Sequence, residues 1–314
     1  MGTLPEVRTG FKQENKLGTA KKMTPHAAIL SSRAKVEAVA SEAFAFAKIR
    51  FHSGRVKLLP THRCHDYADL CRRWKNVAAG LGWKMRKLCV AGGDPIWWIE
   101  SPSAAAGEPS FYVSAGVHGD EPGATEGLLR WASQLGKKWA GASVVLFPCL
   151  NPTGLRNNTR VDYRGVDLNR QFQVFDDEVC AAWRRIVTPR TFRFCLCLHE
   201  DYDAQGAYVY DLSNSSQGVS HEMLKAMPKR MPIDARPKIE GRAAVGGVIH
   251  RKKAPHIAAG MPEAIVLYQL GCPTSLTFET PSEFSLDDRA EAQAAFVSAA
   301  FAWTQATLNP HGSR

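Results

Sequence analysis

The chain of 314 residues has no apolar run of about 18 or more residues, the length that a membrane-spanning helix needs. Its first residues are polar and lack the apolar stretch of a secretory signal. Its eight cysteines include no Cys-x-x-Cys pair, and their scatter is typical of reduced thiols. We therefore expect a cytoplasmic protein that does not span a membrane, with 45% hydrophobic residues to build a core.

The net charge of +10 is unevenly distributed along the chain. Residues 1–90 hold 18 Lys and Arg against 6 Asp and Glu, a charge of +12, so the remainder carries −2. No alternation of basic and aromatic residues accompanies this excess, and we expect a solvated basic surface rather than a nucleic-acid contact. Composition predicts a basic, partly disordered extension over 1–60, with a possible Ala-rich helix at 32–49, and a single domain over 61–308.

Strands and helices alternate along most of the expected domain. This order predicts an α/β sheet covered by helices on both faces, with its functional site at the carboxyl ends of strands. Apolar patterning and turn residues predict strands at 85–90, 96–100, 111–117, 143–148, 192–198, 207–211, 264–268 and 275–278, helices at 66–81, 123–135, 176–187 and 287–306, and a long loop at 149–172.

The sequence His-Gly-Asp-Glu at 118–121 follows one of these strands and precedes a Pro-Gly bend. A histidine and a carboxylate three residues apart on such a loop can turn toward one point. Both side chains suit zinc, and a catalytic site with a third protein ligand leaves one position for water. The alternative is that His118 and Glu121 are solvated residues beside a turn.

A third ligand should also follow a strand, and His199 comes directly after the β-rich run 192–198. Its alternative is a solvated loop histidine. Cys195 and Cys197 share its face of the strand, which makes a thiolate-rich site conceivable. Same-face residues of one strand lie too far apart to bind one ion together, so we favour buried core thiols.

The long loop carries several arginines, and a loop of this length inside a compact domain is typically functional. Arginine offers a planar fork that binds a carboxylate bidentately. Arg156 and Arg164 are equally consistent with a solvated loop. Asn169 and Arg170 lie between apolar neighbours, which favours a role in a site.

A carboxylate, Glu279, follows the short strand at 275–278. A water molecule activated by zinc needs a base that takes its proton and later passes it to the leaving group. Glu279 is the candidate for this base, and the alternative is an exposed, merely solubilising glutamate.

In chain order these elements are His118 and Glu121, Asn151-Pro-Thr-Gly154, Arg160, Asp167-Leu-Asn-Arg170, His199 and Glu279. The series resembles the zinc carboxypeptidase (funnelin) family over about residues 110–305. It is most similar to the bacterial branch that holds murein-peptide amidases, next to the succinylglutamate desuccinylase and aspartoacylase group. The resemblance implies a mixed, mostly parallel central sheet with helices on both faces.

The resemblance also implies one Zn2+ per chain, held by His118, Glu121 and His199. Asp167 would accept a hydrogen bond from His118 and orient its ring.

For the substrate, the resemblance implies that Arg160 polarises the scissile carbonyl and stabilises the oxyanion. Asn169 and Arg170 would bind the terminal carboxylate, and Glu279 would act as general base and then acid.

Two features depart from the family pattern. Thr153 replaces an aspartate on a turn, which is a small change. The substrate-capping tyrosine has no clear counterpart: Arg242 falls nearest its place, and Tyr208 and Tyr268 are weak substitutes. These departures concern the outer pocket rather than hydrolysis.

We therefore expect a zinc metallocarboxypeptidase or murein-peptide amidase that hydrolyses an amide bond next to a free carboxylate. Its substrate would be a peptide, or an N-acyl amino acid if the chain is instead a deacylase of the succinylglutamate desuccinylase or aspartoacylase type. An alternative of another class is a non-catalytic zinc-binding scaffold recruited through the basic N-terminus.

Overall fold

The computed structural model describes residues 63–136, 139–214, 218–255, 257 and 260–308. The expected extension at 1–60, with its helix at 32–49, lies outside these residues. The expected boundary between extension and domain therefore stays a prediction.

The described residues form strands and helices that alternate along the chain. The strands are β1 (Lys84–Ala91), β2 (Asp94–Glu100), β3 (Ser110–Ser114), β4 (Val144–Phe147), β5 (Phe192–Asp201), β6 (Tyr208–Ser213), β7 (Lys238–Ile239), β8 (Arg242–Ala243), β9 (Val248–Arg251) and β10 (Thr274–Pro281). The helices are α2 (Tyr67–Leu81), α3 (Pro102–Ala105), α4 (Pro122–Gln134), α5 (Pro152–Asn157), the 3-10 helix η3 (Leu168–Arg170), α6 (Glu178–Val187), α7 (Gly218–Lys225), α8 (Glu263–Gln269) and α9 (Leu286–Leu308). None of these helices is long and apolar enough to cross a membrane.

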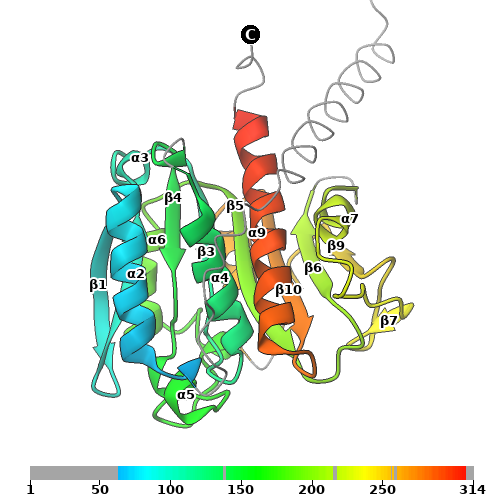
Figure 1. Cartoon of the computed structure of the whole chain (residues 1–314), viewed down its shortest axis with the longest axis horizontal. Helices are drawn as coiled ribbons and strands as arrows, with labels where there is room; N and C mark the ends of the chain where they lie inside the picture. The colour runs from blue at the N-terminus through cyan, green and yellow to red at the C-terminus, as the bar shows by residue number, and fades with distance from the viewer. Residues whose placement is uncertain (1–62, 137–138, 215–217, 256, 258–259, 309–314) are drawn as a thin grey trace, which may run out of the picture. The chain divides into compact units, whose positions relative to one another are not determined.

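Eight strands form one sheet in the order β1-β2-β4-β3-β5-β10-β6-β9, and β7 pairs with β8 in a separate hairpin (Figure 1). Four of the seven neighbouring pairs in the sheet are parallel, namely β4 with β3, β3 with β5, β5 with β10, and β6 with β9. The mixed, mostly parallel sheet is therefore confirmed. Its order places β3, β5 and β10 side by side, and their parallel direction brings their carboxyl ends to one edge.

Helices cover both faces of the sheet. Helices α2, α4, α7 and α9 pack on one face and α6 on the other (Figure 1), and α8 packs into the same core as α6. The alternation of side chains along β3 shows the two cores: Phe111 contacts Phe301 of α9, whereas the hydroxyl of Tyr112 accepts a hydrogen bond of 2.7 Å from Trp183 of α6. Nearly continuous apolar runs in β3, β4 and β5 follow from burial on both faces.

The prediction of a strand at 264–268 is wrong, because these residues form α8. The run is short, apolar and partly β-branched, a pattern that a buried helix shares with a strand. Pro262 stands at the N-cap of the helix, and Val266 and Leu267 pack into the core beside α6. The loop expected at 149–172 also contains α5 and η3.

Helices α4 and α9 approach closely at Gly127. A Cβ atom there would lie 2.3 Å from Cβ of Gln293. The amide of Gln293 donates hydrogen bonds to the carbonyl of His199, at 2.7 Å, and to the hydroxyl of Thr280, at 3.0 Å. The packing of these helices therefore supports the ends of β5 and β10.

Gly127→Ala should destabilise the fold, because the added methyl group displaces Gln293. Alanine in a helix gains up to about 1 kcal/mol over glycine, but overpacking costs about 1–3 kcal/mol. Gly80→Ala in α2 is the matched control, since its methyl group would meet nothing within 4 Å. Urea denaturation should show Gly80→Ala as neutral or stabilising and Gly127→Ala as destabilising, whereas equal stabilisation by both would contradict the close packing.

Candidate functional site

His118 and Glu121 lie on the turn that joins β3 to α4. Gly116, with φ of +63°, redirects the chain after β3, and the Gly119 amide donates to the carbonyl of Thr159 at 3.0 Å. Glu121 is the N-cap of α4 but makes no side-chain capping bond. Its carboxylate instead turns toward the end of the sheet.

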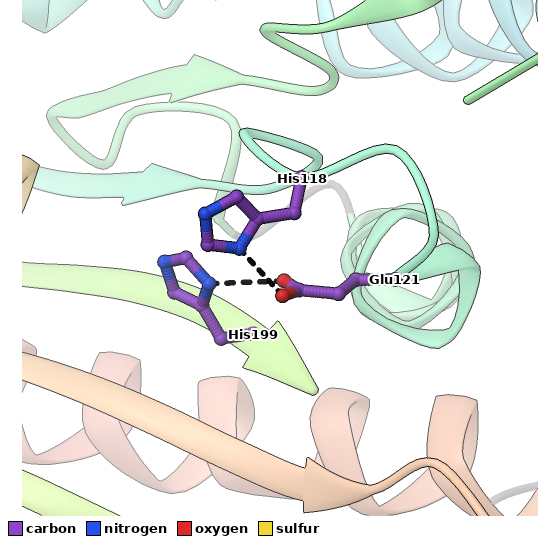
Figure 2. Close-up of side chains that lie close together, drawn as sticks. All are labelled: His118, Glu121 and His199. Atoms are coloured by element: carbon purple, nitrogen blue, oxygen red, sulfur yellow. Dashed lines mark hydrogen bonds and ion pairs between the residues drawn. The ribbon is translucent and has the colours of Figure 1, made fainter. Parts of the chain in front are cut away.

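Glu121 lies between two histidine rings, one from its own turn and one from β5. Its Oε1 is 2.6 Å from Nδ1 of His118, and its Oε2 is 2.9 Å from Nδ1 of His199 (Figure 2). The two ring centroids are 4.9 Å apart, and all three side chains are buried. One ligand atom from each residue lies within 4.8 Å of the others, so these three residues form a group that could hold a metal ion.

The other ring nitrogen of His118, Nε2, lies next to the carboxylate of Asp167. Its Oδ1 lies 3.1 Å from Nε2 of His118 and accepts a bond of 2.8 Å from the Asn169 amide. Its Oδ2 accepts bonds of 3.2 and 3.1 Å from Arg160. A carboxylate that accepts from Nε2 of His118 keeps a proton on that nitrogen, which leaves Nδ1 as the atom that contacts Glu121 or would bind a metal ion.

The charges at this point compensate one another. Burial alone would lower the pKa of His118, but Glu121 and Asp167 outweigh it and raise the pKa to about 9. Burial alone would raise the pKa of Glu121, but the two histidines hold it below its usual range. Two imidazole nitrogens and one carboxylate are also a donor set of catalytic zinc, so these residues fit that ion.

Glu279 stands beside the histidines because β10 pairs in parallel with β5, with Glu279 opposite His199. Its side chain lines the same cavity, and burial raises its pKa, with Glu121 adding to the effect. Two other glutamates are less suited to act as base. Glu200 is held by Arg289 through a bond of 2.6 Å, and Glu283 is exposed and does not line the cavity.

The cavity has a volume of about 310 Å3, and seven of the eight expected site residues line it. They are His118, Glu121, Arg160, Asn169, Arg170, His199 and Glu279, with Asp167 hydrogen-bonded to His118 and Arg160. The side chain of Arg160 is 46% exposed, so its guanidinium can reach a ligand.

Asn169 and Arg170 lie in η3 on the wall of this cavity. Oδ1 of Asn169 accepts a bond of 3.0 Å from the Glu263 amide at the start of α8, which leaves the NH2 group of Asn169 as a donor. Arg170 donates to the carbonyl of Asn169 at 2.9 Å, and no carboxylate of the described residues forms an ion pair with it. The side chains of Asn169 and Arg170 thus present hydrogen-bond donors to the cavity, and no carboxylate of the described residues pairs with the guanidinium.

Cys195 and Cys197 are buried core thiols. Both side chains pack in the core beside α6 and α8, and burial raises the pKa of each thiol well above its usual range. Such thiols do not provide thiolate ligands.

Of the tyrosines considered as substitutes for the capping residue, Tyr208 lines the cavity but is buried and donates to Asp201 at 3.0 Å. Tyr268 donates to the carbonyl of Lys252 at 2.9 Å and does not line the cavity. Arg242 does line it. The sequence reasoning missed Tyr210 and Arg251, which also line it, because only the pairing of β6 and β9 assigns them to this face.

Comparisons with known proteins agree with this geometry. Residues 108–236 match the succinylglutamate desuccinylase/aspartoacylase catalytic domain, a segment that includes the His-Glu-His group but ends before Glu279. The chain is 36% identical over 104 residues to carboxypeptidase SOL1 of Arabidopsis thaliana, covering 28% of this chain and 21% of the relative. It is 38% identical over 80 residues to murein peptide amidase A of Escherichia coli K12, covering 26% and 31%. The matched segments thus span less than a third of either curated relative.

The fold comparison extends further along the chain. A crystal structure of a candidate metallopeptidase from Shewanella amazonensis is similar with a TM-score of 0.67 and 26% identity, over 75% of this chain and 92% of that one. A metallo-carboxypeptidase from Burkholderia cenocepacia shares the fold with a TM-score of 0.56. Together, the matched catalytic domain, the murein peptide amidase segment and the metallopeptidase fold support a zinc carboxypeptidase-like family for this chain.

Proposed function

We propose that this chain is a zinc-dependent metallocarboxypeptidase or murein-peptide amidase that hydrolyses an amide bond next to a free carboxylate. The observation that carries the proposal is the convergence of the His118, Glu121 and His199 group with Glu279 on one cavity. Metal-assisted hydrolysis needs residues that can bind a metal ion and, next to them, a group that can act as general base, and a buried carboxylate can fill the second role.

Zinc bound by this group would supply Lewis acidity toward a carbonyl oxygen and lower the pKa of a water molecule. Glu279 would take the proton of the attacking water and deliver it to the leaving nitrogen. Arg160 would donate hydrogen bonds to the oxygen that becomes negative. Asp167 would support both parts, because it contacts His118 and Arg160 together.

Recognition of a terminal carboxylate is assigned to Asn169 and Arg170. The amide and guanidinium lie next to each other on the cavity wall, and the guanidinium has a fork that matches a carboxylate. The same pair would serve a peptide with a free C-terminus or an N-acyl amino acid.

The deacylase alternative is supported by the match to the succinylglutamate desuccinylase/aspartoacylase catalytic domain. The segments shared with a carboxypeptidase and a murein peptide amidase favour the peptide substrate. Rates on short peptides and on N-acyl amino acids would separate the two. A scaffold without activity would not require Arg160 and Glu279 to face the metal group. The cytoplasmic location stays a prediction.

The purified protein should contain about one zinc per chain. His118→Ala and His199→Ala should lose the metal, because each removes one of three ligands. Cys195→Ser and Cys197→Ser should keep it, provided that circular dichroism shows them folded. Elemental analysis decides the question, and loss of zinc in folded cysteine variants would overturn the ligand set.

Glu279→Gln should lower kcat by about a hundredfold or more, because the amide keeps the shape of the side chain but cannot accept a proton. Zinc content should not change. Glu283→Gln is the matched control, since it removes an exposed carboxylate four residues further on. Near-normal turnover in Glu279→Gln would assign the base elsewhere, with Glu200 as the next residue to test.

Peptides with a free terminal carboxylate should be cleaved, and the same peptides as C-terminal amides should be poor substrates. Arg170→Ala should remove roughly a tenfold to hundredfold difference between the two forms by weakening productive binding. Arg160→Ala should instead lower kcat on every substrate. Arg156→Ala, whose side chain pairs with Asp94, should change neither. Equal cleavage of acid and amide forms by the unmodified enzyme would contradict the proposed carboxylate recognition.

A further inference from the structure

The floor of the cavity is formed by one face of three neighbouring strands. In β10 this face carries Ser275, Thr277 and Glu279, because alternate side chains of a strand share a face. Because β10 pairs with β6, and β6 with β9, each of these side chains continues into a row of neighbouring side chains that crosses the three strands on the same face. The row farthest from the metal group consists of Ser275, Leu212 and Arg251.

Arg251 is the basic end of that row. It lines the cavity at the row of Ser275, four residues along β10 from Glu279, which is about 13 Å at ~3.3 Å per residue. Within the described part of the chain, no carboxylate forms an ion pair with it. The undescribed internal residues at 137–138, 215–217, 256 and 258–259 contain no Asp or Glu.

The nearest acid in the neighbouring strand faces away from Arg251. Asp211 of β6 is one residue before Leu212, and it therefore lies on the opposite face of the sheet. There its two oxygens accept bonds of 2.5 Å from Ser213 and 2.6 Å from Ser220 of α7. Its charge is thus bound on the helix-covered side and does not pair with the guanidinium.

The other acids of the cavity gather at its opposite end. Asp201 pairs in register with Pro281, beyond Glu279 and away from Ser275. Asp201, Asp203 and Glu240 lie close enough together that their oxygens fall within 4.8 Å. These acids therefore lie toward the carboxyl ends of β5 and β10, whereas Arg251 lies at the other end of the cavity floor.

Apolar side chains lie next to Arg251 on the floor of the cavity. Leu212 is its partner on β6, and Ile249 precedes it by two residues on the same face of β9; Ile257 and Ile265 also line the cavity. A bound group that satisfies the guanidinium and contacts these side chains has an aliphatic stem and an anionic tip. A side-chain carboxylate such as that of glutamate has this chemistry.

We propose that Arg251 is a specificity-determining residue that binds a second carboxylate, on the side chain of the amino acid released from the substrate. Asn169 and Arg170 take the α-carboxylate of that amino acid, and the aliphatic wall takes the stem. The inference rests on the proposed hydrolysis of an amide bond next to a free carboxylate and narrows its substrates to those that release an acidic amino acid.

Substrate pairs that end in glutamate or glutamine test the charge alone. Peptides and N-acyl amino acids of both kinds, in L and D forms, keep the α-carboxylate and the side-chain size. The glutamate form should have a kcat/KM roughly tenfold to a hundredfold higher. Arg251→Met should bring the ratio close to one. Lys252→Met should leave it unchanged, because it removes an exposed charge of the next residue, which does not line the cavity.

A second variant, Arg251→Glu, should turn the preference toward substrates that end in lysine, with thermal melting used to confirm that both variants fold. Equal cleavage of the glutamate and glutamine forms by the unmodified enzyme would overturn the inference. So would an equal loss on both forms in Arg251→Met, since that result assigns Arg251 to the α-carboxylate.

If the proposed function itself is wrong, the enzyme should hydrolyse neither the glutamate-ending nor the glutamine-ending substrates. Calorimetric titration with free glutamate and free glutamine then decides the inference alone. Tighter binding of glutamate that is lost in Arg251→Met supports the assignment, and equal or absent binding of the two amino acids refutes it.

Discussion

The carboxylate of Glu121, held between two imidazoles, is the contact on which the rest of the site depends. A buried charge is stable only when opposite charges or hydrogen bonds compensate it. Here the compensation comes from His118 on the same turn and from His199 at the end of β5. The parallel pairing of β3 with β5 brings these segments to one edge of the sheet, so the fold of the central strands and the chemistry of the site depend on the same pairing.

The parts of the site whose residues lie close together in the chain could be predicted from the sequence alone. A histidine three residues before a glutamate, after an apolar strand, already indicates half of a metal site, and a second strand that ends in histidine indicates the other half. The contact between Asp167 and His118 joins residues 49 positions apart, and only the family resemblance pointed to it. The α/β architecture followed from the alternation of strands and helices, since that order leaves few arrangements of layers.

The parts that the sequence did not reveal depend on long-range pairing. Helix α8 was read as a strand because a short apolar run has no period of its own, and its burial against α6 and the sheet decides in favour of a helix. The short strands β7, β8 and β9 and helix α7 carry patterns too brief to detect. Since β9 forms one edge of the sheet, the residues that it contributes to the cavity could not be identified in advance.

Register decides which charge β9 offers to the cavity. Arg251 lies opposite Leu212 and faces the cavity, whereas His250 lies opposite Asp211 on the side of α7. A slip of one residue would exchange the two faces. It would bring an imidazole into the cavity and leave a guanidinium near the carboxylate of Asp211. The group of His118, Glu121 and His199 is independent of this choice, because its residues come from β5 and from the turn after β3. The pairing of β6 with β9 that places Arg251 is separate from the pairing of β3 with β5 that places this group, so under the proposed function the preferred side chain can change while the group is retained.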